Sequence, residues 1–189
     1  MNTHPWIKHT LVGLAVTAFA AGAGAANLLK NPAFNTVGPK GPVVTTVLPG
    51  DGATAAADWL ANTNTPGITF TELLPSTLVP GGRMIHVITD GDRNGVVQVV
   101  GDLGTGPRSG FACVWAYLVS GSIGVGIGNV GNTNGNDMVL NKTGSWEVLQ
   151  VSNGHSPINT LVIFGLGGGA EFYVESAQMS ASKRSCAAK

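Results

Sequence analysis

Short runs of β-branched and other apolar residues recur along the chain from residue 26 onward, and clusters of Gly, Pro, Asn and Asp separate them. No window of useful length repeats its apolar positions every 3.6 residues, as an amphipathic helix would. The pattern predicts an all-β fold of the β-sandwich type. The predicted strands, in chain order, are residues 27–29, 43–48, 59–61, 68–74, 83–89, 95–100, two strands within 113–129, 138–140, 146–151, 161–164 and 170–178.

The most apolar stretch, residues 113–129, predicts two strands that meet in a turn at Ser120-Gly121. Because side chains alternate along a strand, this register places six aliphatic residues on one face: Val114, Ala116, Leu118, Ile123, Val125 and Ile127. The other face then carries Trp115 and Tyr117, each opposite a glycine (Gly126 and Gly124). Large rings opposite glycines would form an open aromatic shelf. The alternative is that another strand or a loop covers both rings.

Residues 83–89 and 95–100 predict a second hairpin around residues 90–94. Its register pairs Val87 with Val97, which places His86 opposite Gln98 on the second face. The turn, Asp90 to Gly95, matches the first half of a D-x-D-x-N-G calcium loop, but the twelfth position is Gly101 rather than glutamate. A polar turn is therefore the favoured interpretation.

Residues 1–25 have the pattern of a signal peptide, in which a basic start precedes an apolar run at 11–20 and the small residues 23–25. The apolar run is shorter than the ~20 residues that a membrane span needs. We therefore expect one domain at 26–180, a polar tail at 181–189 and no membrane insertion. The expected location is secreted or extracellular, with the periplasm and the cell surface as alternatives.

The chain contains two cysteines, Cys113 and Cys186. In an exported protein an even number of cysteines permits a disulfide, which here would tie the tail to the central strands. The alternative is a buried Cys113 and an unpaired cysteine in the tail.

Charge is sparse and balanced, with ten Lys and Arg against ten Asp and Glu. Without Lys8 of the signal peptide the net charge is −1, since nine basic residues remain against ten acidic ones. Nucleic acids and anionic membranes attract basic surfaces, so neither is an expected partner. A neutral, polar surface suits a neutral partner such as a glycan.

Catalytic patterns are missing from the sequence. There is no G-x-S-x-G elbow around a serine and no H-E-x-x-H pair. Asp58, Glu72 and Glu147 could pair in space as the carboxylates of a glycosidase do, but their spacing gives no indication of it. We therefore expect the protein not to be an enzyme.

Three segments resemble motifs of secreted carbohydrate-binding modules with the galactose-binding-like jelly roll. Residues 27–35 (NLLKNPAFN) resemble the opening motif, residues 144–147 (GSWE) a strand start, and residues 170–175 (AEFYVE) the closing motif. Modules of this kind bind xylan, glucans or cellulose, so the resemblance implies a jelly roll that binds a polysaccharide.

The resemblance also implies a structural calcium ion where the opening and closing motifs meet. Asn35 stands where the opening motif has glutamate, and Glu175 and Ser176 stand where two aspartates are usual. Calcium prefers several hard oxygen ligands, carboxylates among them. We therefore expect calcium to add at most a modest stabilisation.

Together these observations predict non-catalytic binding of a polysaccharide or cell-surface glycan. Trp115 and Tyr117 would stack on sugar rings, while Gln98 and His86 would bind hydroxyl groups. The alternative is a structural or adhesive surface protein that uses the same fold for contacts with other proteins.

Overall fold

The computed structural model describes residues 26–47, 52–62, 64–101, 110–128, 138–153, 159–181 and 186, and the statements below concern these residues. Ten strands and no helix occur among them, which confirms the predicted all-β class. The strands are β1 (Val43–Val47), β2 (Gly52–Ala53), β3 (Leu60–Asn62), β4 (Ile68–Pro75), β5 (Arg83–Thr89), β6 (Gly95–Val99), β7 (Gly110–Gly128), β8 (Met138–Leu140), β9 (Trp146–Asn153) and β10 (Thr160–Ser180). No helix in this part of the chain is long and apolar enough to cross a membrane.

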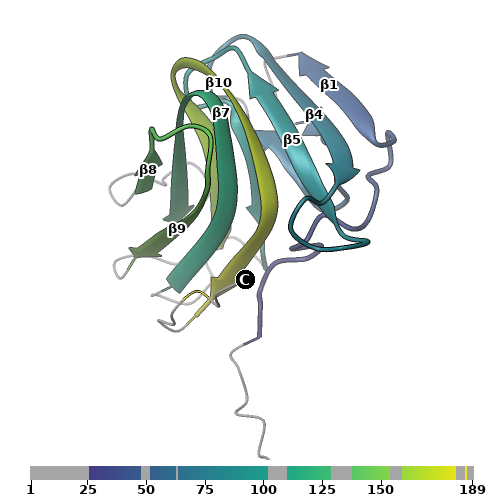
Figure 1. Cartoon of the computed structure of the whole chain (residues 1–189), viewed down its shortest axis with the longest axis vertical. Helices are drawn as coiled ribbons and strands as arrows, with labels where there is room; N and C mark the ends of the chain where they lie inside the picture. Colours follow the sequence, from purple (N-terminus) through teal and green to yellow (C-terminus); the bar gives the residue numbers. More distant parts are fainter. Residues whose placement is uncertain are drawn as a thin grey trace, which may run out of the picture.

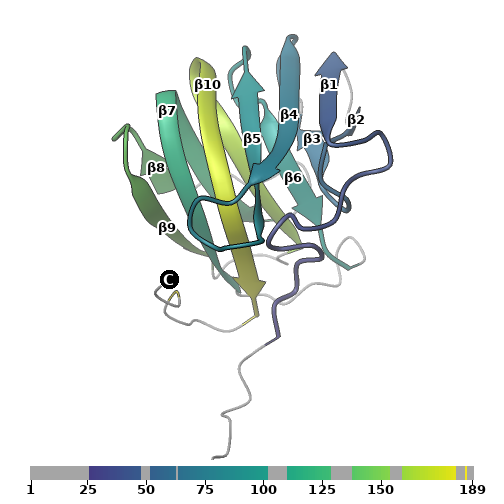
Figure 2. The ribbon, with the colours of Figure 1, turned by 45° about the vertical axis from the view of Figure 1, so that its right-hand side comes forward.

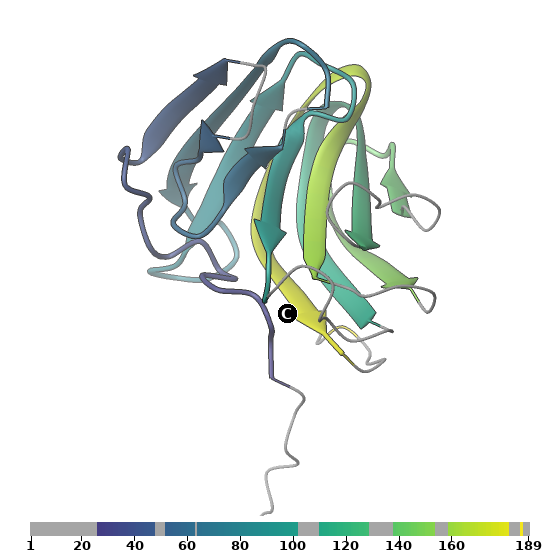
Figure 3. The same cartoon turned by 180° about the vertical axis from the view of Figure 1, so that it is seen from behind.

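Two antiparallel layers form the sandwich, and the two longest strands take part in both (Figure 1). The first layer has the order β1-β4-β5-β10-β7-β9, and its six strands lie side by side in Figure 2. The second layer has the order β2-β3-β6-β10-β7-β8 and is seen from behind in Figure 3. β7 and β10 arch together from one layer into the other, which completes the predicted jelly roll.

The turn predicted at Ser120-Gly121 is a bend within β7 rather than the tip of a hairpin. Both halves of β7 pair with β10, so the predicted pairing of one half with the other is wrong. Gly121 has a φ of 79°, and a Cβ at this position would lie 2.4 Å from the backbone oxygen of Gly169. The chain therefore uses glycine here because two arching strands approach each other closely.

The six aliphatic side chains predicted to share a face are nevertheless all in the core. Each is at most 1% exposed. Register shifts in the β7–β10 ladder, between Gly165 and Ala170 and between Glu171 and Phe172, change the alternation at the arch. The inward set can therefore move from even positions before the arch to odd positions after it.

The second predicted hairpin is also wrong, because β5 and β6 belong to different layers. β5 pairs with β4 and with the C-terminal half of β10, whereas β6 pairs with β3 and with the N-terminal half of β10. The segment between them, residues 90–94, crosses from one layer to the other. Its side-chain oxygens accept backbone N–H groups of neighbouring segments: Asp90 Oδ1 from Ile68 of β4, Asp92 Oδ1 from Gly167 of β10, and Asn94 Oδ1 from Asn64 and Thr65.

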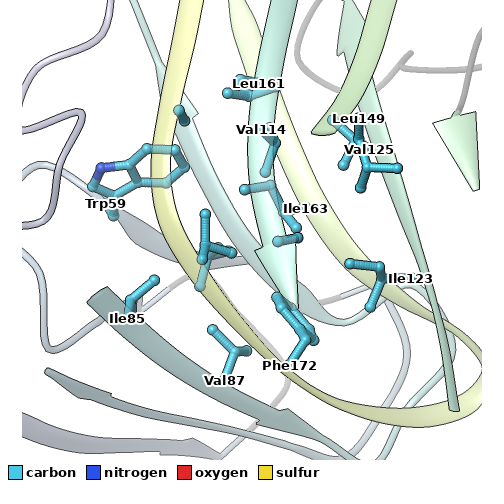
Figure 4. Close-up of a cluster of buried hydrophobic side chains, with 14 of the residues drawn as sticks. Trp59, Ile85, Val87, Val114, Ile123, Val125, Leu149, Leu161, Ile163 and Phe172 are labelled. Carbon is cyan, nitrogen blue, oxygen red and sulfur yellow. The ribbon is translucent and has the colours of Figure 1, made fainter. Parts of the chain in front are cut away.

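The core fills the space between the layers with aliphatic side chains and a few large rings (Figure 4). Trp59 is 1% exposed, and its Nε1 donates to the carbonyl of Asn31 at 3.2 Å. The opening segment does not form the strand predicted at residues 27–29. It runs beside the end of β10, where the N–H of Leu28 donates to Met179 and the N–H of Ala177 donates to Pro32.

The predicted disulfide between Cys113 and Cys186 is present. Cys113 points to the outer face of the first layer, where it packs with Phe111 and Trp115, and Cys186 packs against this cluster. The bridge thus covers part of the outer face with residue 186 of the tail.

Candidate functional site

A row of aromatic side chains crosses five neighbouring strands on the outer face of the first layer. The row consists, in spatial order, of Trp146 on β9, Tyr117 on β7, Tyr173 on β10, His86 on β5 and Phe70 on β4. Ring centroids of successive members are 5.7, 6.1, 4.5 and 6.0 Å apart. The first four members pair directly in register, so the arrangement follows from the pairing of the strands. We call these five residues the aromatic row.

An open groove of about 490 Å³ follows one end of the aromatic row. Three row members, Tyr117, Trp146 and Tyr173, line it together with Thr77, Met84 and Val119. The three rings are half-buried, so part of each remains accessible. The groove therefore offers aromatic surface, as a binding site for a ring-shaped ligand requires.

The loop between β4 and β5 contributes Thr77 to this groove. Ser76 begins the loop, and its Oγ donates to Glu175 Oε1 at 2.5 Å while accepting the N–H groups of Leu78 and Val79. Glu175 occupies the register shift in β10 between Val174 and Ser176. The bulge thus directs the buried carboxylate of Glu175 toward the loop, and the hydrogen bond to Ser76 anchors the loop beside the groove.

His86 lies between two glutamates. Its Nε2 is 3.0 Å from Glu171 Oε1, and its Nδ1 is 3.7 Å from Glu72 Oε2. The imidazole side chain is 11% exposed, whereas each glutamate side chain is about one third exposed, at 32% and 33%. His86 also stacks on Tyr173 with an interplanar angle of 25°. Burial, and then the charges of Glu171 and Glu72, raise the pKa of Tyr173 above its ordinary value.

The predicted aromatic shelf is only partly realised. Tyr117 lies in the groove, but Trp115 is 7% exposed and pairs with Ser176 and Val148 instead of Gly126. Its ring packs in the cluster of Phe111, Cys113 and Cys186. The register predicted for Trp115 is therefore wrong because β7 pairs with β10 and β9, and the predicted exposure is wrong because the ring packs in this cluster.

The two predicted hydroxyl-binding side chains do not lie together. Gln98 is 2% exposed, and its amide makes two hydrogen bonds with the backbone of Lys30, at 2.6 and 2.8 Å. It holds the opening segment against β6. His86 is in the aromatic row, but its Nδ1 is buried and makes no hydrogen bond with the described residues, while its Nε2 contacts Glu171. The geometry therefore directs both ring nitrogens toward carboxylates.

The predicted calcium residues contact opposite ends of the β4–β5 loop. Asn35 Oδ1 accepts the N–H of Arg83 at 3.1 Å, and Glu175 accepts the hydroxyl of Ser76. Among the described residues no group of three or more His, Cys, Asp and Glu could hold a metal ion. The side chains present therefore do not form a carboxylate-rich calcium site. A modest effect of calcium stays a prediction, to be measured as the change in melting temperature on adding a chelator.

Sequence reasoning missed Trp146, Tyr173 and Glu171. Trp146 begins an otherwise aliphatic strand, a pattern that is typical of a core residue. The signal for Tyr173 was the alternation of residues 170–178, which places it on the face opposite Phe172 and Val174. Strand alternation gives a face, but it does not give the neighbouring strand, and the row exists only across strands.

No protein-family model and no curated protein sequence matches the chain. Solved structures do match it, at low sequence identity. A protein from Bacteroides thetaiotaomicron, provisionally described as sugar-binding, is 14% identical with a TM-score of 0.52, over 82% of this chain and 99% of that one. The chain has the fold of that protein.

Carbohydrate-binding modules are among the other structural neighbours. The CBM22-1 xylan-binding domain of Xyn10C from Paenibacillus barcinonensis is 13% identical with a TM-score of 0.49, over 82% of this chain and 94% of that one. The family 11 module of the cellulase Lic26A-Cel5E from Clostridium thermocellum is 13% identical with a TM-score of 0.47, over 74% of this chain and 95% of that one. Likeness at this level of identity concerns the fold alone.

Proposed function

We propose that this protein is a secreted, non-catalytic module that binds a glycan in the groove beside the aromatic row. The observation that carries the proposal is the groove itself, in which the half-buried rings of Trp146, Tyr117 and Tyr173 come together from three adjacent strands. The C–H face of a sugar ring can stack on such aromatic planes, and nearby polar groups can bind its hydroxyls.

Two further observations support the proposal. The groove is open at the surface, which suits a polymer that extends beyond a single binding site. The disulfide is typical of proteins from oxidising compartments, and with the signal-like residues 1–25 it supports export. Glycans of the cell surface or of its surroundings would then be accessible partners.

A glycan array, followed by pull-down on insoluble polysaccharides, tests the proposal. Tyr117→Ala and Trp146→Ala should each abolish binding and leave the protein folded, because both rings are only half-buried. Val148→Ala is the matched control. Val148 is 42% exposed on β9, shares the face of Trp146 and does not line the groove.

Three results would contradict the proposal. Absence of binding to every glycan would remove the function, and binding unchanged in both ring variants would remove the site. Release of reducing sugar from a bound polysaccharide would show catalysis. Attachment to cells from which glycans have been stripped would instead support the alternative, an adhesive protein that contacts other proteins.

A further inference from the structure

Two carboxylates flank His86, the second-to-last member of the aromatic row. Glu72 on β4 and Glu171 on β10 flank His86, which stacks on Tyr173 at the edge of the groove. A single imidazole carries at most one positive charge. The three side chains therefore have a net charge of −2 when His86 is neutral and −1 when it is protonated.

On the strands of this face that the structure describes, no outward side chain is basic enough to offset the two glutamates. Strand alternation gives the outward positions around the row as 68–74 (even) on β4, 84–88 (even) on β5, 111–119 (odd) on β7, 146–150 (even) on β9, and 171, 173, 176 and 178 on β10. None of these described positions is lysine or arginine. Lys142 lies beyond the other end of the row, where it pairs with Glu147 at 2.6 Å.

We propose that Glu72 and Glu171 restrict the groove to glycans that carry no carboxylate groups, an inference that rests on the proposed glycan-binding function. A uronic acid bound beside Tyr173 would bring a third negative charge close to two carboxylates that are two-thirds buried. Two like charges repel each other more strongly in a partly desolvated site than in bulk water. Sugar hydroxyls, in contrast, donate to carboxylate oxygens in hydrogen bonds of the stronger, charge-assisted kind.

His86 acts on this selection as a positioning residue. Its Nε2 contacts Glu171, and its buried Nδ1 faces Glu72, so the ring fixes the separation of the two carboxylates. Burial is the main cause of the raised pKa of Tyr173, and the charges of Glu171 and Glu72 add to it. The repulsion keeps its sign in either protonation state of His86, because the net charge of the three side chains is negative in both.

Matched pairs of neutral and carboxylated polymers test the inference. Suitable pairs are hydroxyethylcellulose with carboxymethylcellulose, arabinoxylan with glucuronoxylan, and methyl-esterified with de-esterified polygalacturonan. Affinity electrophoresis of the protein at low ionic strength should show the neutral member bound at least about fivefold more tightly. The ratio should shrink as salt is added, because salt screens the repulsion.

The isosteric double variant Glu72→Gln/Glu171→Gln should bring the affinities for the two members of a pair together. It should do so by strengthening binding of the carboxylated member. Glu147→Gln is the matched control, since the charge of Glu147 is already paired with Lys142 beside Trp146. This variant should keep the wild-type ratio.

The possible results separate the inference from the function on which it rests. Equal affinity of the wild-type protein for both members of a pair, or a ratio that persists in the double variant, would overturn the charge selection and leave glycan binding intact. Binding of none of the six polymers by the folded protein, together with absence of binding on the glycan array, would overturn the glycan-binding function, and the charge selection with it.

Discussion

The two halves of β7 differ in what they place on the outer face of the sandwich, although their inner faces are alike. Before the arch the outward residues include three rings, Phe111, Trp115 and Tyr117, and the disulfide-bonded Cys113. After the arch the outward residues are Gly124 and Gly126, while Ile123 and Val125 continue the core. One strand therefore supplies rings to the first layer and none to the second.

In the second layer the ring comes from the neighbouring strand. Phe164 on β10 pairs with Gly124, and a Cβ on Gly124 would lie 2.6 Å from Cζ of this ring. The guanidinium carbon of Arg93 lies 5.1 Å from the ring centroid on this outer face, and Phe164 is 1% exposed. The pairing of a ring with glycine thus produces a closed, packed surface here.

The comparison corrects the premise of the aromatic shelf. The sequence contains both glycines and rings, and their pairing was predicted to keep the rings open. In the structure the ring over glycine is buried, whereas the open groove forms where rings stand beside other rings, at Tyr117 and its neighbours. Open aromatic surface on this sheet therefore depends on what lies above the rings rather than on small residues beside them.

Trp115→Ala should have the largest effect on stability, because it removes a buried ring from the cluster on the outer face of the first layer. Removing a buried tryptophan costs about 3–5 kcal/mol of unfolding free energy. Tyr117→Ala, two residues along the same strand, should cost clearly less because its ring is half-buried. Urea unfolding of both variants measures the difference. Equal, small losses would show that the Trp115 ring is exposed after all.

Cys186→Ser should have the next largest effect, since it breaks the disulfide that joins residue 186 to the same cluster. Loss of a native disulfide typically costs about 2–5 kcal/mol. The variant should be less stable in urea, and Trp115 should become accessible to a fluorescence quencher. Free thiols in the unreduced, denatured wild-type protein would contradict the presence of the bridge.

Alternation along single strands was enough to predict the inward residues and the outward position of Tyr117. Alternation did not predict which strands pair with each other. The residues around Ser120-Gly121 are typical of a bend with a positive φ. Such a bend occurs equally well at the tip of a hairpin and within an arch. Only the length of β10, with its own glycine bend at 165–169, selects the arch. The aromatic row could not be predicted for the same reason, because its five members come from five separate segments.

Gly124→Ala should have a moderate effect and tests the closed half of the comparison. The added methyl group overlaps the Phe164 ring, which is fully buried and has little room to move. Overpacking of this kind costs about 1–3 kcal/mol. Glycan binding at the aromatic row should be unaffected.

Combining Gly124→Ala with Phe164→Leu provides the control, because a smaller side chain leaves room for the methyl group. The double variant should lose less stability than the sum of the two single variants. Strict additivity would mean that Gly124 and Phe164 do not share the space that the structure gives them.

Tyr173→Phe should have the smallest effect on stability. It tests the phenol of Tyr173 in the first layer, which has no counterpart at Phe164 in the second. Burial, followed by the charges of Glu171 and Glu72, raises the pKa of Tyr173 above its ordinary value of about 10. The folded protein therefore holds the phenolic proton more tightly than the unfolded chain does. This contribution to stability is fully present below pH 10 and is lost as the pH rises through the pKa of the folded state.

Urea unfolding between pH 8 and pH 11 should thus show a smaller alkaline decline in stability in Tyr173→Phe than in the wild type. Tyr117→Phe, which retains Tyr173, should keep the wild-type decline. Identical declines in all three proteins would show that the two glutamates and the burial of the ring do not hold this proton. The surroundings of Tyr173 would then be more solvated than their geometry indicates.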